Sequence, residues 1–297
     1  MNIIETSGLG HAYGDVVALH GLELELEGGT IGLVGANGAG KTTLVKILLG
    51  ILTPTLGSVK VFGIPVAERP LEVRARVGYM PERDCLPEDQ TASDFVTYTA
   101  ELAGLPKKAS RQRASDVLTL VGLHEERFRP IGEFSTGMKQ RTKLAQAIVH
   151  DPDLVLLDEP TSGLDPQGRE DMLSLVGRLG GFGINVVTSS HVLTDIEQTC
   201  DWVVMLDGGK VLRSGPLSGL GQTGVIEVEL TSPVDPFMAW LEANGASTHY
   251  DGRVIFVRAE RNGFEMVRDG LTATESGLRR LRESSTSLED IFMGRST

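Results

Sequence analysis

One glycine-rich run has the residue types and spacing to bind a polyphosphate. It fits the pattern G-x-x-x-x-G-K-[ST], and its residues are Gly35, Ala36, Asn37, Gly38, Ala39, Gly40, Lys41 and Thr42. Glycines let backbone N–H groups approach phosphates without interference from a Cβ atom. Lys41 has the length to reach the β- and γ-phosphates, and the Thr42 hydroxyl suits one position on Mg²⁺. The run therefore predicts a nucleoside triphosphate site.

The segments on either side of this run have the pattern that a phosphate-binding loop requires. Residues 30–34 are typical of a buried strand, and residues 43–49 are typical of a helix that stops at Gly50. A helix that begins at the loop directs the positive end of its dipole at the phosphates. A plain glycine-rich turn between a strand and a helix is the simpler alternative.

An acidic pair follows a second apolar run. Residues 154–157 read Leu-Val-Leu-Leu, and Asp158 and Glu159 come directly after them. Ligand sites lie at the carboxyl ends of parallel strands, so we expect Asp158 near the glycine-rich loop. Asp158 would hold Mg²⁺ directly or through water, and Glu159 would orient or deprotonate the attacking water. Without the loop, a solvated strand end would explain this pair equally well.

The composition limits the classes of protein to which the chain can belong. Its 297 residues are 40% hydrophobic and 23% charged, which is ordinary for a soluble protein of about two domains. The net charge of −12 disfavours general binding to nucleic acid or to an anionic membrane, although a local basic patch remains open. The two cysteines, Cys85 and Cys200, form no disulfide or zinc pattern, which fits a reducing cytosol.

The sequence shows neither a secretory signal nor a membrane-spanning run. Its longest apolar runs fall far short of the roughly 20 residues that cross a bilayer. We therefore expect any membrane role to come through a partner.

A third motif opens a predicted helix over residues 135–149. It consists of Phe134, Ser135, Thr136, Gly137, Met138, Lys139 and Gln140. At this point the chain resembles the ATP-binding subunits of ABC transporters, in which the signature Leu-Ser-Gly-Gly-Gln opens a helix at the same place. The resemblance covers residues 3–215, and all the expected motifs follow in the family's order, which makes chance agreement negligible.

The resemblance implies ATP and Mg²⁺ as ligands and assigns a role to each motif. Lys41, Glu159 and His191 would be catalytic, and Thr42, Glu82 and Asp158 would contact the metal. The implied nucleotide contacts are Tyr13 (stacked on adenine), Gly35, Asn37, Gly38, Ala39, Gly40, Lys41, Thr42, Thr43, Glu82, Ser135, Gly137 and Asp165. Taken alone, Ser135 would more simply be a helix cap and His191 a polar loop residue.

Two departures from the family pattern give further information. Thr136 and Met138 stand where the signature commonly has Gly and Gln, and Glu82 replaces the usual Gln. Both variations resemble exporter-type members that carry drugs, antibiotics or lipids. The stretch Ser287-Leu288-Glu289-Asp290-Ile291-Phe292 also resembles the chain ends of those exporters.

The pattern and the resemblance together predict an α/β fold. We expect a P-loop ATPase core over residues 1–215, with a mostly parallel sheet, an antiparallel β subdomain and a helical subdomain at about residues 91–134. Alternating residues after about position 216 predict a small C-terminal α+β domain, in βαββαβ order, with an accessory or regulatory role.

The resemblance also implies partners and a place in the cell. Two copies, or one copy and a homologous ATPase subunit, would enclose two ATP molecules. An integral-membrane permease would dock near Glu82 and the helical subdomain. The protein would be cytoplasmic and peripheral at the inner face of the cell membrane, and no nucleic acid is expected as a partner.

Two other functions compete with a transport role. A soluble ABC ATPase could act on DNA or the ribosome, but residues 43–134 contain no sustained heptads and no cysteine cluster, and only one cassette is present. A nucleotide sensor without catalysis would not need Lys41, Asp158, Glu159 and His191 together. The sequence therefore favours an ATPase that drives an exporter.

Overall fold

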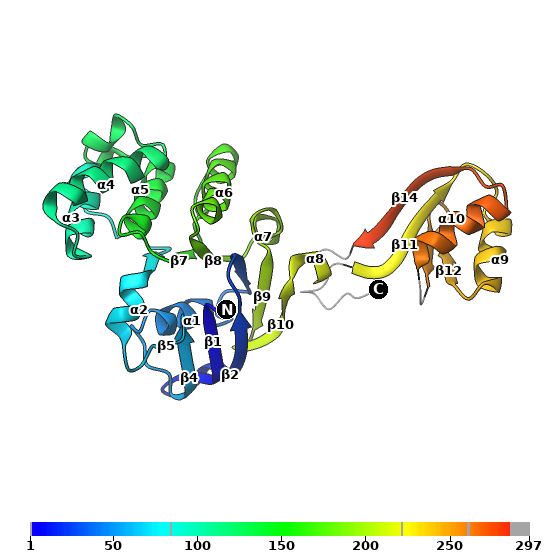
Figure 1. The fold of residues 1–297 in the computed structure, drawn as a ribbon, viewed down its shortest axis with the longest axis horizontal. Helices are drawn as coiled ribbons and strands as arrows, with labels where there is room; N and C mark the ends of the chain where they lie inside the picture. Colours follow the sequence, from blue (N-terminus) through cyan, green and yellow to red (C-terminus); the bar gives the residue numbers. More distant parts are fainter. Residues whose placement is uncertain (1, 84, 221, 260–261, 286–297) are drawn as a thin grey trace. The chain divides into compact units, whose positions relative to one another are not determined.

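The computed structural model describes residues 2–83, 85–220, 222–259 and 262–285 (Figure 1). The chain separates into two units, Met1–Leu217 and Ser218–Thr297, and each has a hydrophobic core of its own. The stretch Ser287–Phe292 lies outside the described residues.

Continuous apolar runs form the central sheet of the first unit, as the sequence predicts. All residues of β3 (Thr30–Val34) and β7 (Leu154–Asp158) are buried, as is typical of strands covered on both faces. The strands lie in the order β10 (Lys210–Pro216), β9 (Trp202–Asp207), β3, β8 (Asn185–Ser190), β7 and β6 (Val77–Met80). Every pair is parallel except β9 with β10, so β3, β7 and β8 end at one edge.

Alternating residues form a second, antiparallel sheet in the same unit. Its strand order is β2 (Val16–Leu26), β1 (Ile4–Tyr13), β4 (Leu56–Val61) and β5 (Ile64–Pro65). In β2, Leu24 is buried and the adjacent Glu25 is exposed, which is the period-two pattern that the sequence shows. Leu44 and Ile47 of α1 (Lys41–Leu48) pack in a core with residues of both sheets.

Three helices pack together in the first unit and appear in green in Figure 1. They are α3 (Ala92–Leu102), α4 (Lys107–Leu120) and α5 (Thr136–Ile148). Thr91 caps α3, because its hydroxyl oxygen accepts a hydrogen bond from the Asp94 N–H at 3.1 Å. The small Ala100 side chain lies in the core, whereas Tyr98 and Leu102 on the same helix are exposed. Residues of α5 share one hydrophobic core with residues of α3 and α4.

The remaining helices of this unit are short or lie beside the central sheet. They are α2 (Pro70–Arg76), α6 (Pro166–Gly181) and α7 (Leu193–Thr199), together with 3₁₀ turns at Glu126–Phe128 and Ile131–Glu133. A further short helix, α8 (Leu217–Leu220), lies where the sequence passes from the first unit to the second. Within the described ranges, no helix combines the length and the apolar character needed to cross a membrane.

Gly78 lets β6 pack closely against α5. A Cβ atom added at Gly78 would lie 1.9 Å from the Ala147 carbonyl oxygen. Gly78→Ala must therefore separate strand from helix, and we expect it to lower the free energy of unfolding by about 1–3 kcal/mol. Chemical denaturation would measure this loss.

Gly180→Ala is the matched control, because it adds the same methyl group in α6 with no heavy atom within 4 Å. We expect the free energy of unfolding of this variant to rise by up to about 1 kcal/mol, because alanine has a higher helix propensity than glycine. Equal losses of stability in the two variants would contradict the close packing of β6 on α5.

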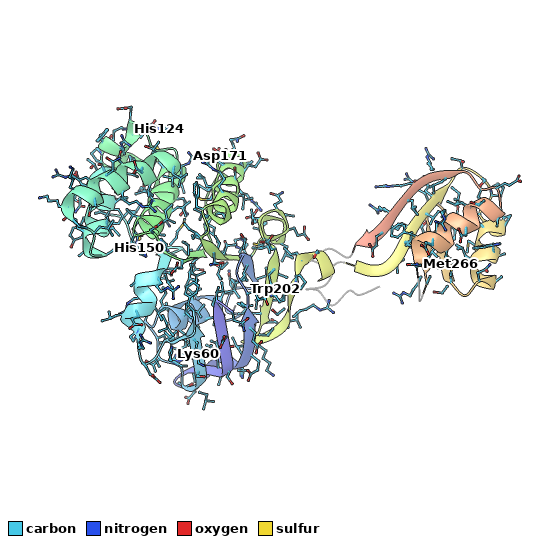
Figure 2. The ribbon with its side chains drawn as sticks, viewed as in Figure 1. Lys60, His124, His150, Asp171, Trp202 and Met266 are labelled. Carbon is cyan, nitrogen blue, oxygen red and sulfur yellow. The ribbon has the colours of Figure 1, made fainter. Side chains whose placement is uncertain are left out.

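The second unit has the βαββαβ order that the sequence predicts. Its elements are β11 (Gln222–Leu230), α9 (Asp235–Ala243), β12 (Ser247–Tyr250), β13 (Ile255–Arg258), α10 (Gly263–Ala273) and β14 (Leu278–Ser285). The antiparallel sheet has the order β12-β13-β11-β14, which is the ferredoxin-like arrangement. Val228, Ile255 and Phe237 form its core, and Met266, labelled in Figure 2, packs against them.

Candidate nucleotide-binding site

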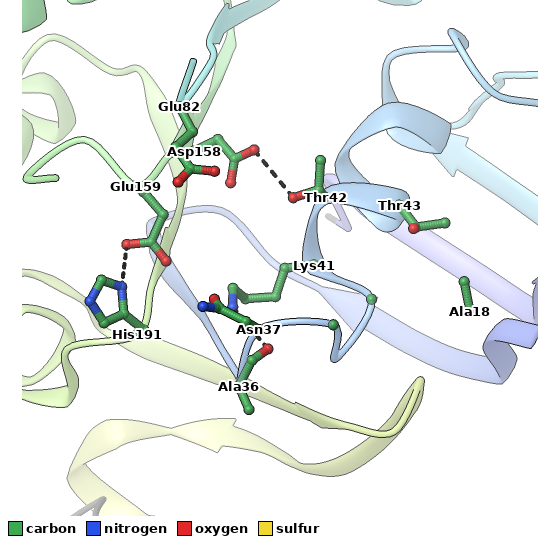
Figure 3. A pocket seen from close by; sticks show the side chains of 12 residues that line it. Ala18, Ala36, Asn37, Lys41, Thr42, Thr43, Glu82, Asp158, Glu159 and His191 are labelled. Carbon is green, nitrogen blue, oxygen red and sulfur yellow. Dashed lines mark hydrogen bonds and ion pairs between the residues drawn. The ribbon is translucent and has the colours of Figure 1, made fainter.

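The glycine-rich loop and the ends of two strands surround one pocket of about 340 Å³ (Figure 3). Its lining combines residues that are distant in sequence: Ala18, Ala36, Asn37, Gly38, Gly40, Lys41, Thr42, Thr43, Glu82, Asp158, Glu159 and His191. Asp158 ends β7 and His191 follows β8, so parallel strands deliver both to the edge where the loop after β3 begins. The structure thus brings together most of the predicted site residues.

The backbone at Gly40 lets the loop enter α1. Gly40 has φ 103°, in the region that favours glycine, and an added Cβ would lie 2.8 Å from the Ala18 carbonyl oxygen. Lys41 begins the helix, and its Nζ donates to the Gly35 carbonyl at 2.5 Å and to the Ala36 carbonyl at 3.3 Å. An ammonium held over the loop, beside the positive end of the α1 dipole, is well placed to meet phosphate oxygens.

Two hydroxyl groups fix the carboxylate of Asp158. The Ser189 hydroxyl donates to its Oδ1 at 2.6 Å, and the Thr42 hydroxyl donates to its Oδ2 at 3.5 Å. Ser189 also accepts a hydrogen bond from the Glu159 N–H at 3.0 Å, so one serine holds both acidic residues. Because Mg²⁺ prefers hard oxygen ligands, the Thr42 hydroxyl and the Asp158 carboxylate are a suitable donor pair for this ion.

Glu159 has a strained backbone and a buried carboxylate. Its φ of 51° is unusual for a residue with a side chain, and such strain is often found at functional sites. The Oε2 atom lies 2.8 Å from Nδ1 of His191. Burial raises the pKa of Glu159 above its usual value, while the hydrogen bond with His191 and the charge of Lys41 act in the opposite direction. A raised pKa and a hydrogen-bonded histidine are features expected of a general base.

Removing His191 should change the pH dependence of hydrolysis. In His191→Ala the hydrogen bond that lowers the pKa of Glu159 is lost, so this pKa rises further. A base works only when deprotonated, and the acidic limb of the kcat profile should therefore move to higher pH. Steady-state phosphate release from pH 5 to pH 9 would measure it.

His249→Ala, which changes an exposed histidine of the second unit, should leave that limb in place. An unmoved limb in His191→Ala would contradict the coupling between His191 and Glu159.

A second pocket, of about 540 Å³, collects the signature residues. Its lining includes Ser135, Gly137 and Asp165. The Ser135 hydroxyl caps α5 by accepting from the Met138 N–H at 3.3 Å, and Asp165 caps α6 by accepting from the Gly168 N–H at 3.1 Å. Two helix N-termini therefore border this pocket, and such ends favour anions. No described residue lines both pockets.

Three predicted site residues do not line either pocket. Gly35 contributes the carbonyl that Lys41 contacts, and Ala39 is buried within the loop. Tyr13, at the end of β1, is 47% exposed and meets the His11 ring edge to face, with ring centroids 4.7 Å apart. Its ring is accessible, and its stacking on adenine remains a prediction.

Ser189 and Ala18 belong to the site although the sequence did not single them out. A polar run, Thr188–His191, follows the two valines of β8 at the same edge as Asp158, and this signal points to Ser189. Ala18, on β2, lines the same pocket, and no sequence pattern marks it as a site residue.

Comparison with known proteins identifies the family. Residues 19–162 match the ABC transporter family. The chain is 36% identical to the uncharacterized ABC transporter ATP-binding protein YxlF of Bacillus subtilis, over 89% of this chain and 88% of that protein. It belongs to the ATP-binding proteins of ABC transporters. Members of this family hydrolyse ATP to drive transport, so the protein is the ATPase subunit of a transporter.

A second relative and a solved structure support the same family and fold. The ABC ATPase is 33% identical to the Nod factor export ATP-binding protein I of Burkholderia orbicola, over 95% of this chain and 92% of that protein. A solved ATP-binding subunit of an ABC transporter superposes with a TM-score of 0.66 at 28% identity, over 73% of this chain and 91% of that one. The predicted family, fold class and ATPase activity are thereby confirmed.

Proposed function

We propose that the ABC ATPase binds Mg²⁺–ATP in the first pocket, with the phosphates on residues 35–43. Thr42, Asp158 and Glu82 would supply oxygen atoms to the metal, and the 3.5 Å between the Thr42 hydroxyl and Asp158 Oδ2 fits this role. Across the described chain, no group of three His, Cys, Asp or Glu side chains forms a metal cage. Mg²⁺ commonly needs only one or two carboxylates beside substrate phosphates, and it neutralises their developing charge.

Glu159 and His191 act on the attacking water and the γ-phosphate. Because Oε2 of Glu159 is engaged by His191, Oε1 is the atom assigned to the water, from which it accepts a proton. The other ring nitrogen of His191 faces the γ-phosphate, and Lys41 contacts the β- and γ-phosphates. These groups together stabilise the negative charge that develops during hydrolysis.

Two copies arranged head to tail would complete each site. The single observation that carries this proposal is the separation of Lys41 and Glu159 from Ser135 and Gly137, which lie in different pockets of one chain. The second pocket of one copy would close over the γ-phosphate bound to the other copy. ATP then favours the closed pair, and hydrolysis releases it, which turns binding energy into motion.

The closed pair is proposed to drive export through a permease. Support comes from the relative named for Nod factor export, which matches 95% of this chain, and from the exporter-like variants at Glu82 and Met138. Tyr98 and Leu102 give α3 an exposed apolar surface for a permease segment. In this proposal residues 1–215 act as the ATPase domain at the cytoplasmic face of the membrane, and residues 216–297 are accessory.

Purification of the tagged full chain from mild-detergent extracts tests the transport role. We expect recovery of an integral-membrane protein whose presence raises ATP turnover, and loss of that recovery in Leu102→Asp. Recovery with ribosomes or DNA, and none with membrane protein, would favour the soluble alternative.

A further inference from the structure

A lysine is buried in the helix that carries the signature motif. Lys143 on α5 is 1% exposed, and its neighbours Thr142 and Leu144 are also buried. Its Nζ donates to the Glu82 carbonyl at 2.9 Å and to the Pro81 carbonyl at 3.1 Å. A buried ammonium needs partners, and an apolar side chain could not donate to these two carbonyls. The lysine is therefore placed to hold this stretch of main chain.

The two carbonyls belong to the segment that carries Glu82 into the first pocket. Glu82 lines this pocket with Thr42 and Asp158, and Figure 3 shows its side chain in the same view as theirs. Lys143 contacts the main chain of this segment and does not line the pocket. It is therefore placed to fix the backbone position of Glu82, from which the Glu82 side chain enters the pocket.

Helix α5 links this segment to the second pocket. Ser135 caps its start, and Lys143 lies eight residues further along, which is about 12 Å of helix. One rigid element thus carries the proposed γ-phosphate contact for a second copy and the anchor of Glu82 for the chain's own site. A rotation of α5 would move the carbonyls of Pro81 and Glu82 with it.

We propose that Lys143 is a positioning residue that holds Glu82 at the metal-binding edge of the ATP site and ties it to α5. The inference rests on the proposed role of Glu82. It predicts that loss of the ammonium disturbs turnover and metal binding of the folded protein, in addition to any loss of stability. A residue that only supported the core would lower the stability and leave turnover and metal binding of the folded protein unchanged.

A double-mutant cycle on the full chain tests this proposal, with Lys143→Met, Glu82→Ala and the combined variant. Lys143→Met should lower kcat and weaken Mn²⁺ binding by roughly 10- to 100-fold, as for other outer partners of a metal site. Glu82→Ala removes the proposed ligand itself and should lower both at least as much. Mn²⁺ affinity is measured by electron paramagnetic resonance with ADP bound. If Lys143 acts through Glu82, the combined variant should be no slower than the slower single variant. The melting temperature of Lys143→Met should fall, because the Pro81 and Glu82 carbonyls lose their donor, so kcat and Mn²⁺ affinity are measured at a temperature at which the variant is folded.

Arg113→Met is the matched control. Arg113 also donates to backbone carbonyls at the end of α5, those of Val149 at 3.1 Å and Ile148 at 3.5 Å, but it does not line the first pocket. Its loss should leave kcat and Mn²⁺ affinity unchanged. Lys143→Gln keeps an N–H donor, so its kcat should lie between those of the wild type and Lys143→Met. If Lys143→Met does not fold, Lys143→Gln takes its place in the double-mutant cycle.

The outcomes separate this inference from the proposed function. Wild-type turnover in Glu82→Ala would contradict the proposed role of Glu82 as a metal ligand. A slow Glu82→Ala beside a normal Lys143→Met would overturn the positioning role. Reductions that multiply in the combined variant would also overturn it, because they would show that Lys143 acts independently of Glu82.

Discussion

Glu159→Gln should lower kcat roughly 100- to 10,000-fold, the usual contribution of a general base. The amide keeps the shape of the side chain and a hydrogen bond to His191, but it cannot accept a proton from water. Binding of Mg²⁺–ATP should persist because the loop and Lys41 are untouched. Single-turnover phosphate release and binding of a fluorescent ATP analogue would measure the two effects separately.

Glu229→Gln provides the control for this change. Glu229 is buried to nearly the same extent as Glu159 but lies in β11 of the second unit, where it pairs with Arg253 at 3.3 Å. Its turnover should equal that of the wild type. Wild-type turnover in Glu159→Gln at saturating Mg²⁺ would refute the assignment of Glu159 as the base.

Lys41→Ala should instead weaken the binding of ATP. A hydrogen bond to a charged group contributes about 1.5–3 kcal/mol, so ATP affinity should fall roughly 10- to 100-fold. The loss should be smaller for AMP, because Lys41 is assigned to the β- and γ-phosphates. Titration calorimetry with ATP and with AMP would measure this difference.

Lys46→Ala changes an exposed lysine on the same helix and should bind ATP like the wild type. The melting temperatures of Lys41→Ala and the wild type should also be compared, because Lys41 donates to the carbonyls of Gly35 and Ala36. This comparison shows whether the variant is folded. Unchanged ATP affinity in Lys41→Ala would contradict its role at the phosphates.

Much of this fold can be predicted from local sequence signals, because the elements concerned are determined by residues close together in the chain. The apolar run of β7, the Thr91 cap and the glycine-rich loop before Lys41 each set a local structure that the molecule shows. Parallel pairing then places Asp158 and His191 at one edge of the sheet. This placement is predictable because each residue follows a strand, and parallel strands end at the same edge. The βαββαβ order of the second unit follows from alternation of strand and helix patterns.

Contacts that depend on tertiary packing could not be predicted in this way. No sequence pattern shows that Ser189 bridges Asp158 and Glu159, or that Lys143 reaches the Glu82 carbonyl across 61 positions. Tyr98 and Leu102 are large apolar residues four positions apart on α3, yet both are exposed and Ala100 lies in the core, since close helix packing selects a small residue.

The central claim is that ATP joins two copies through Gly137 and Ser135, and a mass measurement tests it most directly. Light scattering on Glu159→Gln should give about 31.9 kDa without nucleotide and about twice that value with Mg²⁺–ATP. The doubling should vanish when Gly137→Asp is added, while ATP still binds to each monomer. A mass that stays at the monomer value with ATP bound, or a doubling that survives Gly137→Asp, would contradict the shared site.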